Sequence, residues 1–119
     1  MSDASAPGDG LLVDGARLAA WIGSDPDLQV IDVREGYERE AGHIAGTRHI
    51  ELTRLTAEAP SVARERPVVF YCRVGSRSAM AAEAFRASGY EAYSLDGGLL
   101  RWAEDGRPLS PEGGTVARH

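Results

Sequence analysis

Residues 67–78 read PVVFYCRVGSRS, an apolar run that ends in a cysteine and continues into a short arginine-containing segment. Residues 68–71 form an uninterrupted apolar stretch of the length typical of a strand buried in a parallel sheet. Residues 77–87 are rich in alanine and are followed by a glycine, a pattern that predicts a helix. The segment therefore predicts a buried strand, a short loop and a helix, with Cys72 at the junction.

The surroundings of Cys72, the only cysteine in the chain, favour a reactive thiol. A helix amino terminus offers free N–H groups and a partial positive charge, and nearby guanidinium groups also stabilise a thiolate, which is the nucleophilic form. The alternative is a core cysteine, because a free cysteine usually behaves as a small buried hydrophobe. The apolar run stops at Cys72, however, and Arg73, Gly75 and Arg77 follow, which a core cysteine does not need.

The rest of the chain alternates short apolar runs with amphipathic segments. Helices are expected within 14–22, 35–41, 52–58, 77–87 and 99–106, and strands at 11–13, 28–33, 47–50, 68–71 and 91–95. This alternation predicts an α/β domain with a largely parallel sheet. Ligands bind outside the carboxyl ends of such strands, where Asp32, Arg34 and Cys72 all fall.

Composition restricts the possible functions. The 119 residues carry 13 basic and 18 acidic side chains, a net charge of −5, which argues against general binding to nucleic acid or to an anionic membrane. All the basic residues are arginine, and the lack of lysine excludes Schiff-base chemistry and a Walker-type phosphate loop. A single free thiol fits a reducing compartment, so a cytoplasmic protein is expected.

Domain organisation is also readable from composition. We expect a disordered lead at residues 1–9, one domain at 10–107 and a flexible tail at 108–119, where Pro108, Pro111 and Gly113-Gly114 are concentrated.

The amino terminus lacks the basic and apolar regions of a secretory signal. The three histidines are not spaced as metal ligands, so neither a metal site nor a cofactor is expected, and His43 is not expected to be a catalytic base.

Three segments resemble the rhodanese family of sulfurtransferases. The loop from Cys72 to Ser78 is similar to its active-site loop, residues 30–35 with Glu38 and 42–46 resemble its upstream signature, and Gly97-Gly98 with Trp102 resembles its closing segment. The resemblance covers roughly residues 11–106. Gly36 and Ala45 stand where the family often has proline, and Arg39 replaces a common aromatic residue; these departures affect local rigidity and packing more than sulfur chemistry.

The resemblance implies a five-stranded, mainly parallel sheet flanked by helices, and a cycle in which Cys72 carries sulfur as a persulfide. It implies no cofactor, a small anionic donor such as thiosulfate, and a thiol, a protein or, in assays, cyanide as acceptor. Asp32 would orient an arginine of the loop or cap nearby amides, and Arg34 would form a structural ion pair with Glu35, Glu38 or another acid. The residues implied to bind the donor through backbone N–H groups and side chains are Arg73, Val74, Gly75, Ser76, Arg77 and Ser78.

Two other functions remain in view. A cysteine phosphatase or arsenate reductase of related fold would place its arginine six positions after the cysteine, whereas Arg77 lies five positions after Cys72, and no second cysteine is present. A non-catalytic module would share this sequence pattern, but the best sign of such a module would be loss of the cysteine, and Cys72 is retained. A sulfur carrier that works only with a protein partner would share the pattern as well.

Overall fold

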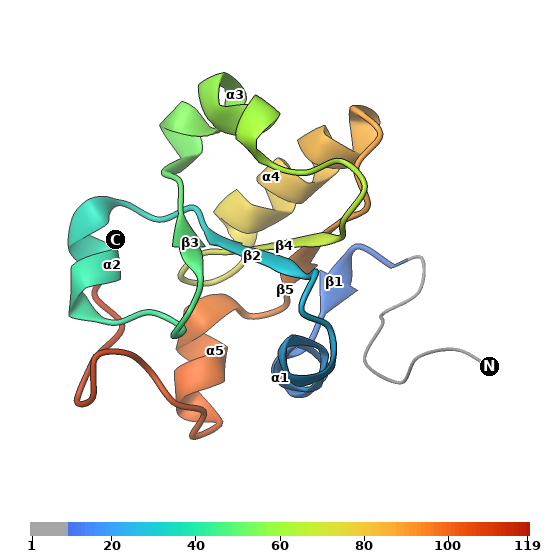
Figure 1. Ribbon diagram of the computed structural model, residues 1–119. Coiled ribbons are helices and arrows are strands. Elements are labelled where there is room, and N and C mark those ends of the chain that lie inside the picture. The colour runs from blue at the N-terminus through green and yellow to red at the C-terminus, as the bar shows by residue number, and fades with distance from the viewer. Residues whose placement is uncertain (1–9) are drawn as a thin grey trace.

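The computed structural model describes residues 10–119, so the expected lead at 1–9 lies outside the described residues. Its centre is a sheet of five parallel strands in the order β1-β5-β4-β2-β3 (Figure 1). The α/β class and the five-stranded parallel sheet are therefore confirmed. The strands are β1 (Leu12–Val13), β2 (Gln29–Asp32), β3 (Arg48–His49), β4 (Val68–Tyr71) and β5 (Ala92–Leu95).

Helices cover both faces of the sheet (Figure 1). On one face α3 (Leu55–Glu58) and α4 (Ser76–Ala87) enclose a core that includes Phe70 and Phe85, and on the other α1 (Gly15–Ser24) and α5 (Gly98–Glu104) enclose a second core. A short helix, α2 (Gly36–Ala41), lies near the β3 edge. Two 3₁₀ turns, Leu52–Arg54 and Ala59–Ser61, flank α3, where one short helix was expected.

Strand β4 runs through the middle of the sheet, and all four of its residues are buried. Successive side chains of a strand point to opposite faces, so Val68 and Phe70 enter one core while Val69 and Tyr71 enter the other. Burial on both faces explains the uninterrupted apolar run in the sequence. It also fixes the position of Cys72, which follows directly at the carboxyl end of the central strand.

The segment after α5 returns across the molecule to α2. Ser110 pairs with His43 through two backbone hydrogen bonds of 2.7 and 2.9 Å, and the Thr115 amide donates to the carbonyl oxygen of Ala41 at 2.8 Å. A Cβ atom on Gly42 would lie 2.4 Å from the Thr115 carbonyl oxygen, so glycine is what allows this close approach. These contacts do not fit the expected flexible tail at 108–119. Composition could not predict them, because it does not show where a segment docks.

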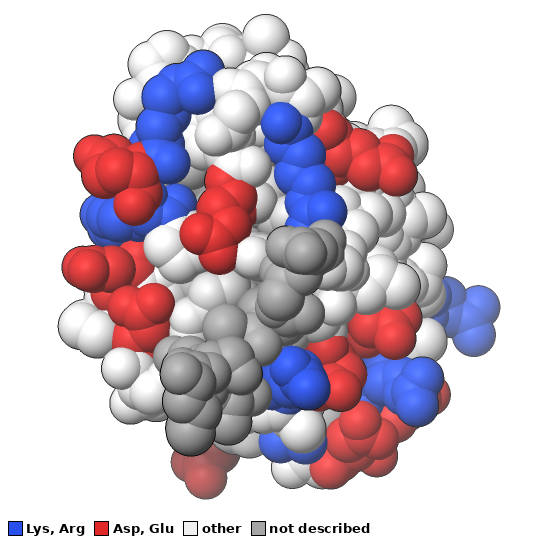
Figure 2. Space-filling model, turned by 90° about the vertical axis from the view of Figure 1, so that its right-hand side faces the viewer, with Lys and Arg blue, Asp and Glu red and all other residues white. Residues whose placement is uncertain are grey.

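Charged side chains are dispersed over the face shown in Figure 2, where basic and acidic groups alternate without a continuous basic patch. No helix within residues 10–119 is long and apolar enough to cross a bilayer.

Candidate active site

The thiol of Cys72 lies inside the loop that joins β4 to α4. Its Sγ accepts hydrogen bonds from the backbone N–H groups of Gly75, at 3.1 Å, and Ser78, at 3.4 Å, and the Ser78 hydroxyl lies 3.5 Å away. The two amides belong to the start of a twelve-residue helix, whose partial positive charge faces the sulfur. Gly75 makes the turn possible because its φ of 110° is unfavourable for any residue with a side chain. The arrangement suits a negatively charged sulfur.

The amino end of α5 supports the same loop from the other side. The amides of Leu99 and Leu100 donate to the carbonyl oxygens of Cys72 and Arg73, at 2.8 and 2.9 Å. Gly98, with a φ of +63°, packs so tightly that a Cβ atom there would lie 2.4 Å from the Arg73 carbonyl oxygen. The paired glycines at 97–98 thus have a structural role, because they bring a helix end onto the backbone of the thiol loop.

Arg77 is bound to a buried carboxylate. Its guanidinium makes two hydrogen bonds to Glu38, of 2.9 and 3.0 Å, and the Glu38 side chain is completely buried. Burial alone would raise the pKa of Glu38, but the hydrogen bonds from Arg77 and from the Glu35 amide lower it below the usual value. The hydrogen bonds between Arg77 and Glu38 raise the pKa of Arg77 above its ordinary value. The pair ties the start of α4 to α2. Because Glu38 offsets the charge of Arg77, this guanidinium is less available to an anionic ligand than the sequence suggested.

Asp32 is paired with different arginines from those expected. Arg34 donates to it through Nε and Nη2, at 2.9 and 2.8 Å, with both side chains fully buried, and Arg39 lies 3.5 Å away. Burial opposes the charge of Arg34, but Asp32 outweighs that effect, so the pKa of Arg34 is raised. Asp32 also accepts the Arg34 backbone N–H, at 3.0 Å, which is the amide-capping role that was expected. Within residues 10–119, no hydrogen bond joins Asp32 to an arginine of the thiol loop.

A surface depression of about 420 Å³ opens over the thiol loop. It is lined by four loop residues that the sequence singled out and by two from the carboxyl end of the chain: Arg73, Val74, Ser76, Arg77, Arg118 and His119. Cys72 itself is fully buried beneath the loop. The contribution of Arg118 and His119 was missed, and no sequence signal reveals it, because it depends on where the last segment docks.

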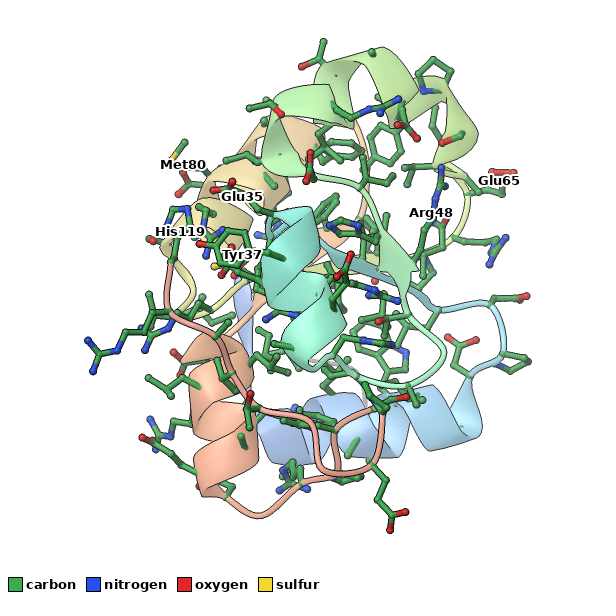
Figure 3. All side chains as sticks on the ribbon, turned by 90° about the vertical axis from the view of Figure 1, so that its left-hand side faces the viewer. Glu35, Tyr37, Arg48, Glu65, Met80 and His119 are labelled. Carbon is green, nitrogen blue, oxygen red and sulfur yellow. The ribbon has the colours of Figure 1, made fainter. Side chains whose placement is uncertain are left out.

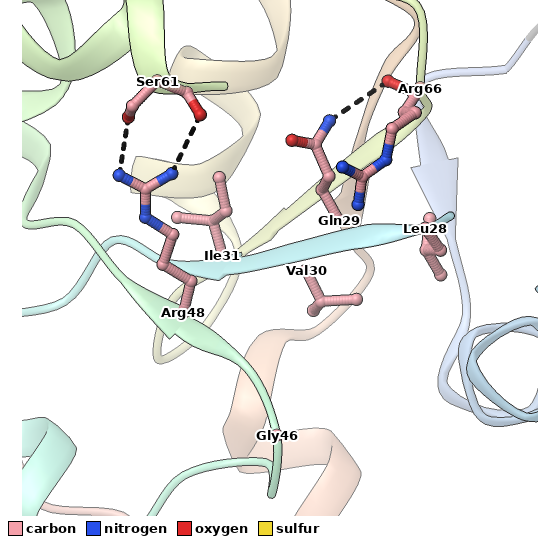
Figure 4. Close-up of a pocket in the computed structure, with 8 residues that line it drawn as sticks. All are labelled: Leu28, Gln29, Val30, Ile31, Gly46, Arg48, Ser61 and Arg66. Carbon is pink, nitrogen blue, oxygen red and sulfur yellow. Dashed lines mark hydrogen bonds between the residues drawn. The ribbon is translucent and has the colours of Figure 1, made fainter. Parts of the chain in front are cut away.

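A second depression, of about 290 Å³, lies at the amino end of β2, away from the thiol (Figure 4). Several of its polar side chains already bind other parts of the protein. Arg48 donates to the carbonyl and hydroxyl oxygens of Ser61, and the Gln29 amide donates to the carbonyl oxygen of Arg66. This site therefore offers no chemistry of its own.

One cluster has the composition of a metal site. Ligand atoms of Glu35, Glu38 and His119 lie within 4.8 Å of one another. Both carboxylate oxygens of Glu38 are engaged by Arg77, and His119 Nε2 lies 2.9 Å from Glu35. The cluster is thus better explained as a set of ion pairs. Elsewhere, His43 and His49 contact backbone carbonyl oxygens through their ring nitrogens.

Comparison with known proteins agrees with this geometry. The family model of the Rhodanese-like domain matches residues 15–105. The chain belongs to the rhodanese-like family. Similar proteins include YqhL of Bacillus subtilis, described as uncharacterized, at 43% identity over 62% of this chain, and a sulfurtransferase of Allochromatium vinosum, at 29% identity over 85% of this chain and 96% of its own length. The chain spans about 60% of the length of YqhL.

The fold is shared with a solved rhodanese-related protein from Thermoplasma volcanium, with a TM-score of 0.79 and 29% identity. The match covers 87% of this chain and all of the other. The sulfurtransferase family is thus supported by sequence and by fold together.

Proposed function

We propose that this protein is a sulfurtransferase that moves sulfane sulfur through a persulfide on Cys72. The observation that carries the proposal is the convergence of the Gly75 and Ser78 amides on Sγ, at the amino end of α4. Fixed N–H groups aimed at one atom stabilise negative charge on that atom without reorganisation during the reaction. A thiolate on Sγ is such a charge, and it is the form of Cys72 that attacks the donor and that returns when the acceptor removes the outer sulfur.

The transfer balances without an external oxidant or reductant. The Cys72 thiolate attacks the outer sulfur of thiosulfate, the sulfur–sulfur bond of the donor breaks, and sulfite leaves with the bonding electron pair. A nucleophilic acceptor, such as a thiol, cyanide or a protein cysteine, then attacks the outer sulfur of the persulfide. That sulfur–sulfur bond breaks and returns the electron pair to Cys72. This is a two-step covalent cycle with ping-pong kinetics.

Loop size argues against the phosphatase alternative. The amides of Gly75 and Ser78 already lie 3.1 and 3.4 Å from Sγ, so the loop encloses a single atom closely. A phosphoryl group needs donors arranged around several oxygens beyond the sulfur. The short spacing between Cys72 and Arg77, and the engagement of Arg77 by Glu38, both make such a cradle less suitable.

We propose only the chemical classes of the physiological donor and acceptor: the donor is a small anion, and the acceptor is a thiol or a protein. A carrier that works only with a protein partner would use the same persulfide. Because the thiol must remain reduced between cycles, we expect the protein to act in a reducing compartment such as the cytoplasm.

The test is steady-state sulfur transfer from thiosulfate, with cyanide or a dithiol as acceptor, compared with hydrolysis of an aryl phosphate. The parent should transfer sulfur and should hydrolyse the phosphate negligibly. Cys72→Ser should abolish transfer while its circular dichroism spectrum stays that of the parent, since serine replaces sulfur with a smaller and far less nucleophilic atom. Retained transfer in Cys72→Ser, or phosphate hydrolysis faster than sulfur transfer, would overturn the proposal.

A further inference from the structure

The carboxyl-terminal segment after α5 reaches the rim of the thiol loop. Arg118 and His119 line the same depression as Arg73 and Arg77, although forty residues of sequence lie between the two pairs. Figure 1 shows the carboxyl end beside α2, and Figure 3 shows His119 next to Glu35 and Tyr37 of that region. The active-site surface is therefore built from two distant parts of the chain.

Specific contacts hold this segment in place. The Tyr37 hydroxyl donates to the carbonyl oxygen of Arg118 at 3.0 Å, and His119 Nε2 lies 2.9 Å from Glu35. Further back, Gly42 and Gly114 pack together: a Cβ atom on Gly114 would lie 3.2 Å from the Gly42 Cα. These contacts hold the backbone of Arg118 at the rim of the depression.

The cations around the depression differ in how much charge they can offer to a ligand. Arg77 is bound by Glu38, and His119 by Glu35. By contrast, neither Arg73 nor Arg118 forms an ion pair with a carboxylate within residues 10–119, and Arg73 Nε is buried without a hydrogen-bond partner in that range. A guanidinium with no acidic partner is the group best able to bind the oxygens of an anion.

We propose that Arg118, acting with Arg73, recognises the oxyanion end of the sulfur donor and so makes the carboxyl-terminal segment a specificity-determining part of the active site. The donor class is an oxyanion that carries a sulfane sulfur, such as a thiosulfonate or thiosulfate. The identity of the donor rests on the proposed function. The attraction of anions to the rim does not, because it can be measured with any small reagent that reacts with Cys72.

The experiment compares the rate at which Cys72 is alkylated by iodoacetate, an anion, with the rate for iodoacetamide, which is neutral. The ratio cancels differences in thiol reactivity and loop opening and reports the electrostatic attraction of the rim. Arg118→Ala should lower this ratio about three- to tenfold, since a charge lining an entrance concentrates anions there. Arg118→Lys should recover most of the ratio, and added salt should lower it in the parent.

Two further variants complete the design. Gly42→Ala should lower the ratio as Arg118→Ala does, because a methyl group 2.4 Å from the Thr115 carbonyl oxygen displaces the segment that carries Arg118. Arg66→Ala is the matched control: it removes an arginine from the amino-terminal end of the sheet, where Arg66 donates to the carbonyl oxygen of Asp27. An unchanged ratio in Arg118→Ala, or an equal fall in Arg66→Ala, would overturn the inference. Failure of the proposed function would appear separately, as a parent that shows the charge preference but transfers no sulfur from thiosulfate.

Discussion

In the proposed sulfur transfer, backbone amides would be the main groups that stabilise charge on the Cys72 sulfur. The two N–H groups that donate to Cys72 Sγ come from Gly75 and Ser78, whereas the guanidinium of Arg77 forms an ion pair with the buried Glu38. Arg77 therefore acts chiefly by fixing the position of α4, from which the amides project. Glu38 offsets its charge locally, so the proposed recognition of an anionic donor would need other cations.

The Arg77–Glu38 pair provides the first prediction. Glu38→Gln leaves Arg77 without its carboxylate in a largely enclosed position, which should lower the free energy of unfolding by about 2 kcal/mol at pH 7. Sulfur transfer should also fall, because the start of α4 is less firmly held. Denaturant unfolding and steady-state kinetics measure the two effects. Glu40→Gln, which changes an exposed carboxylate of the same helix, is the control and should change neither.

The pH dependence of this effect has a defined sign. The pKa of Glu38 is lowered in the folded protein, so its stabilising effect is fully present above the ordinary value of 4.5 and is lost as pH falls through the lower, folded value. The difference in stability between the parent and Glu38→Gln should accordingly shrink as pH is reduced below 4.5. A difference that is constant between pH 7 and pH 3 would contradict the assignment of this ion pair.

At the level of elements, the thiol loop is held between two helix ends. The amino end of α4 faces the sulfur, and the amino end of α5 donates to the carbonyl oxygens of Cys72 and Arg73. The second contact requires Gly98, because its φ of +63° and the 2.4 Å approach to Arg73 both exclude a side chain. The loop is thus clamped through its backbone, while the side chains of Val74 and Ser76 are exposed at the surface.

Gly98→Ala should therefore damage the loop more than an ordinary glycine substitution would. We expect a loss of stability of about 2–3 kcal/mol from strain together with the steric clash, and a fall in sulfur transfer. Gly106→Ala is the matched control, because Gly106 also has a positive φ, of +80°, but nothing lies within 4 Å of its Cβ position. Thermal unfolding and turnover should separate the two variants; equal effects would mean that the contact with the thiol loop is unimportant.

For the whole molecule, the segment after α5 completes the structure by packing on α2. Leu109 and Val116 pack against the second core, and Ser110 and Thr115 form backbone hydrogen bonds with His43 and Ala41. Deleting residues 109–119 should lower the melting temperature by roughly 5–10 °C, as the loss of one to two kcal/mol does in a domain of this size. A deletion variant that melts like the parent would show that these contacts contribute no stability.

The sequence predicted those features that depend on local pattern. The apolar run before Cys72, the glycine after it and the helix that follows all predicted the β4–loop–α4 unit, and the alternation of elements predicted the parallel sheet. What it missed depends on distant contacts. Nothing local indicates that Glu38 meets Arg77, that Asp32 reaches Arg39, or that Arg118 returns to the loop. Arg34 was expected to form a structural ion pair, and its partner is Asp32, two residues away. Gly42 was interpreted as part of the upstream signature and Gly114 as part of a flexible tail, although both pack closely against each other's segment.

The central claim is that Cys72 holds the transferred sulfur, and intact-protein mass spectrometry tests it most directly. After incubation with thiosulfate and removal of the excess, the parent should gain the mass of one sulfur atom, located at Cys72 by peptide mapping. Cyanide or dithiothreitol should remove the added sulfur, and Cys72→Ser should gain none. A parent that remains unmodified while it turns over thiosulfate, or a Cys72→Ser variant that acquires the same mass, would contradict the account.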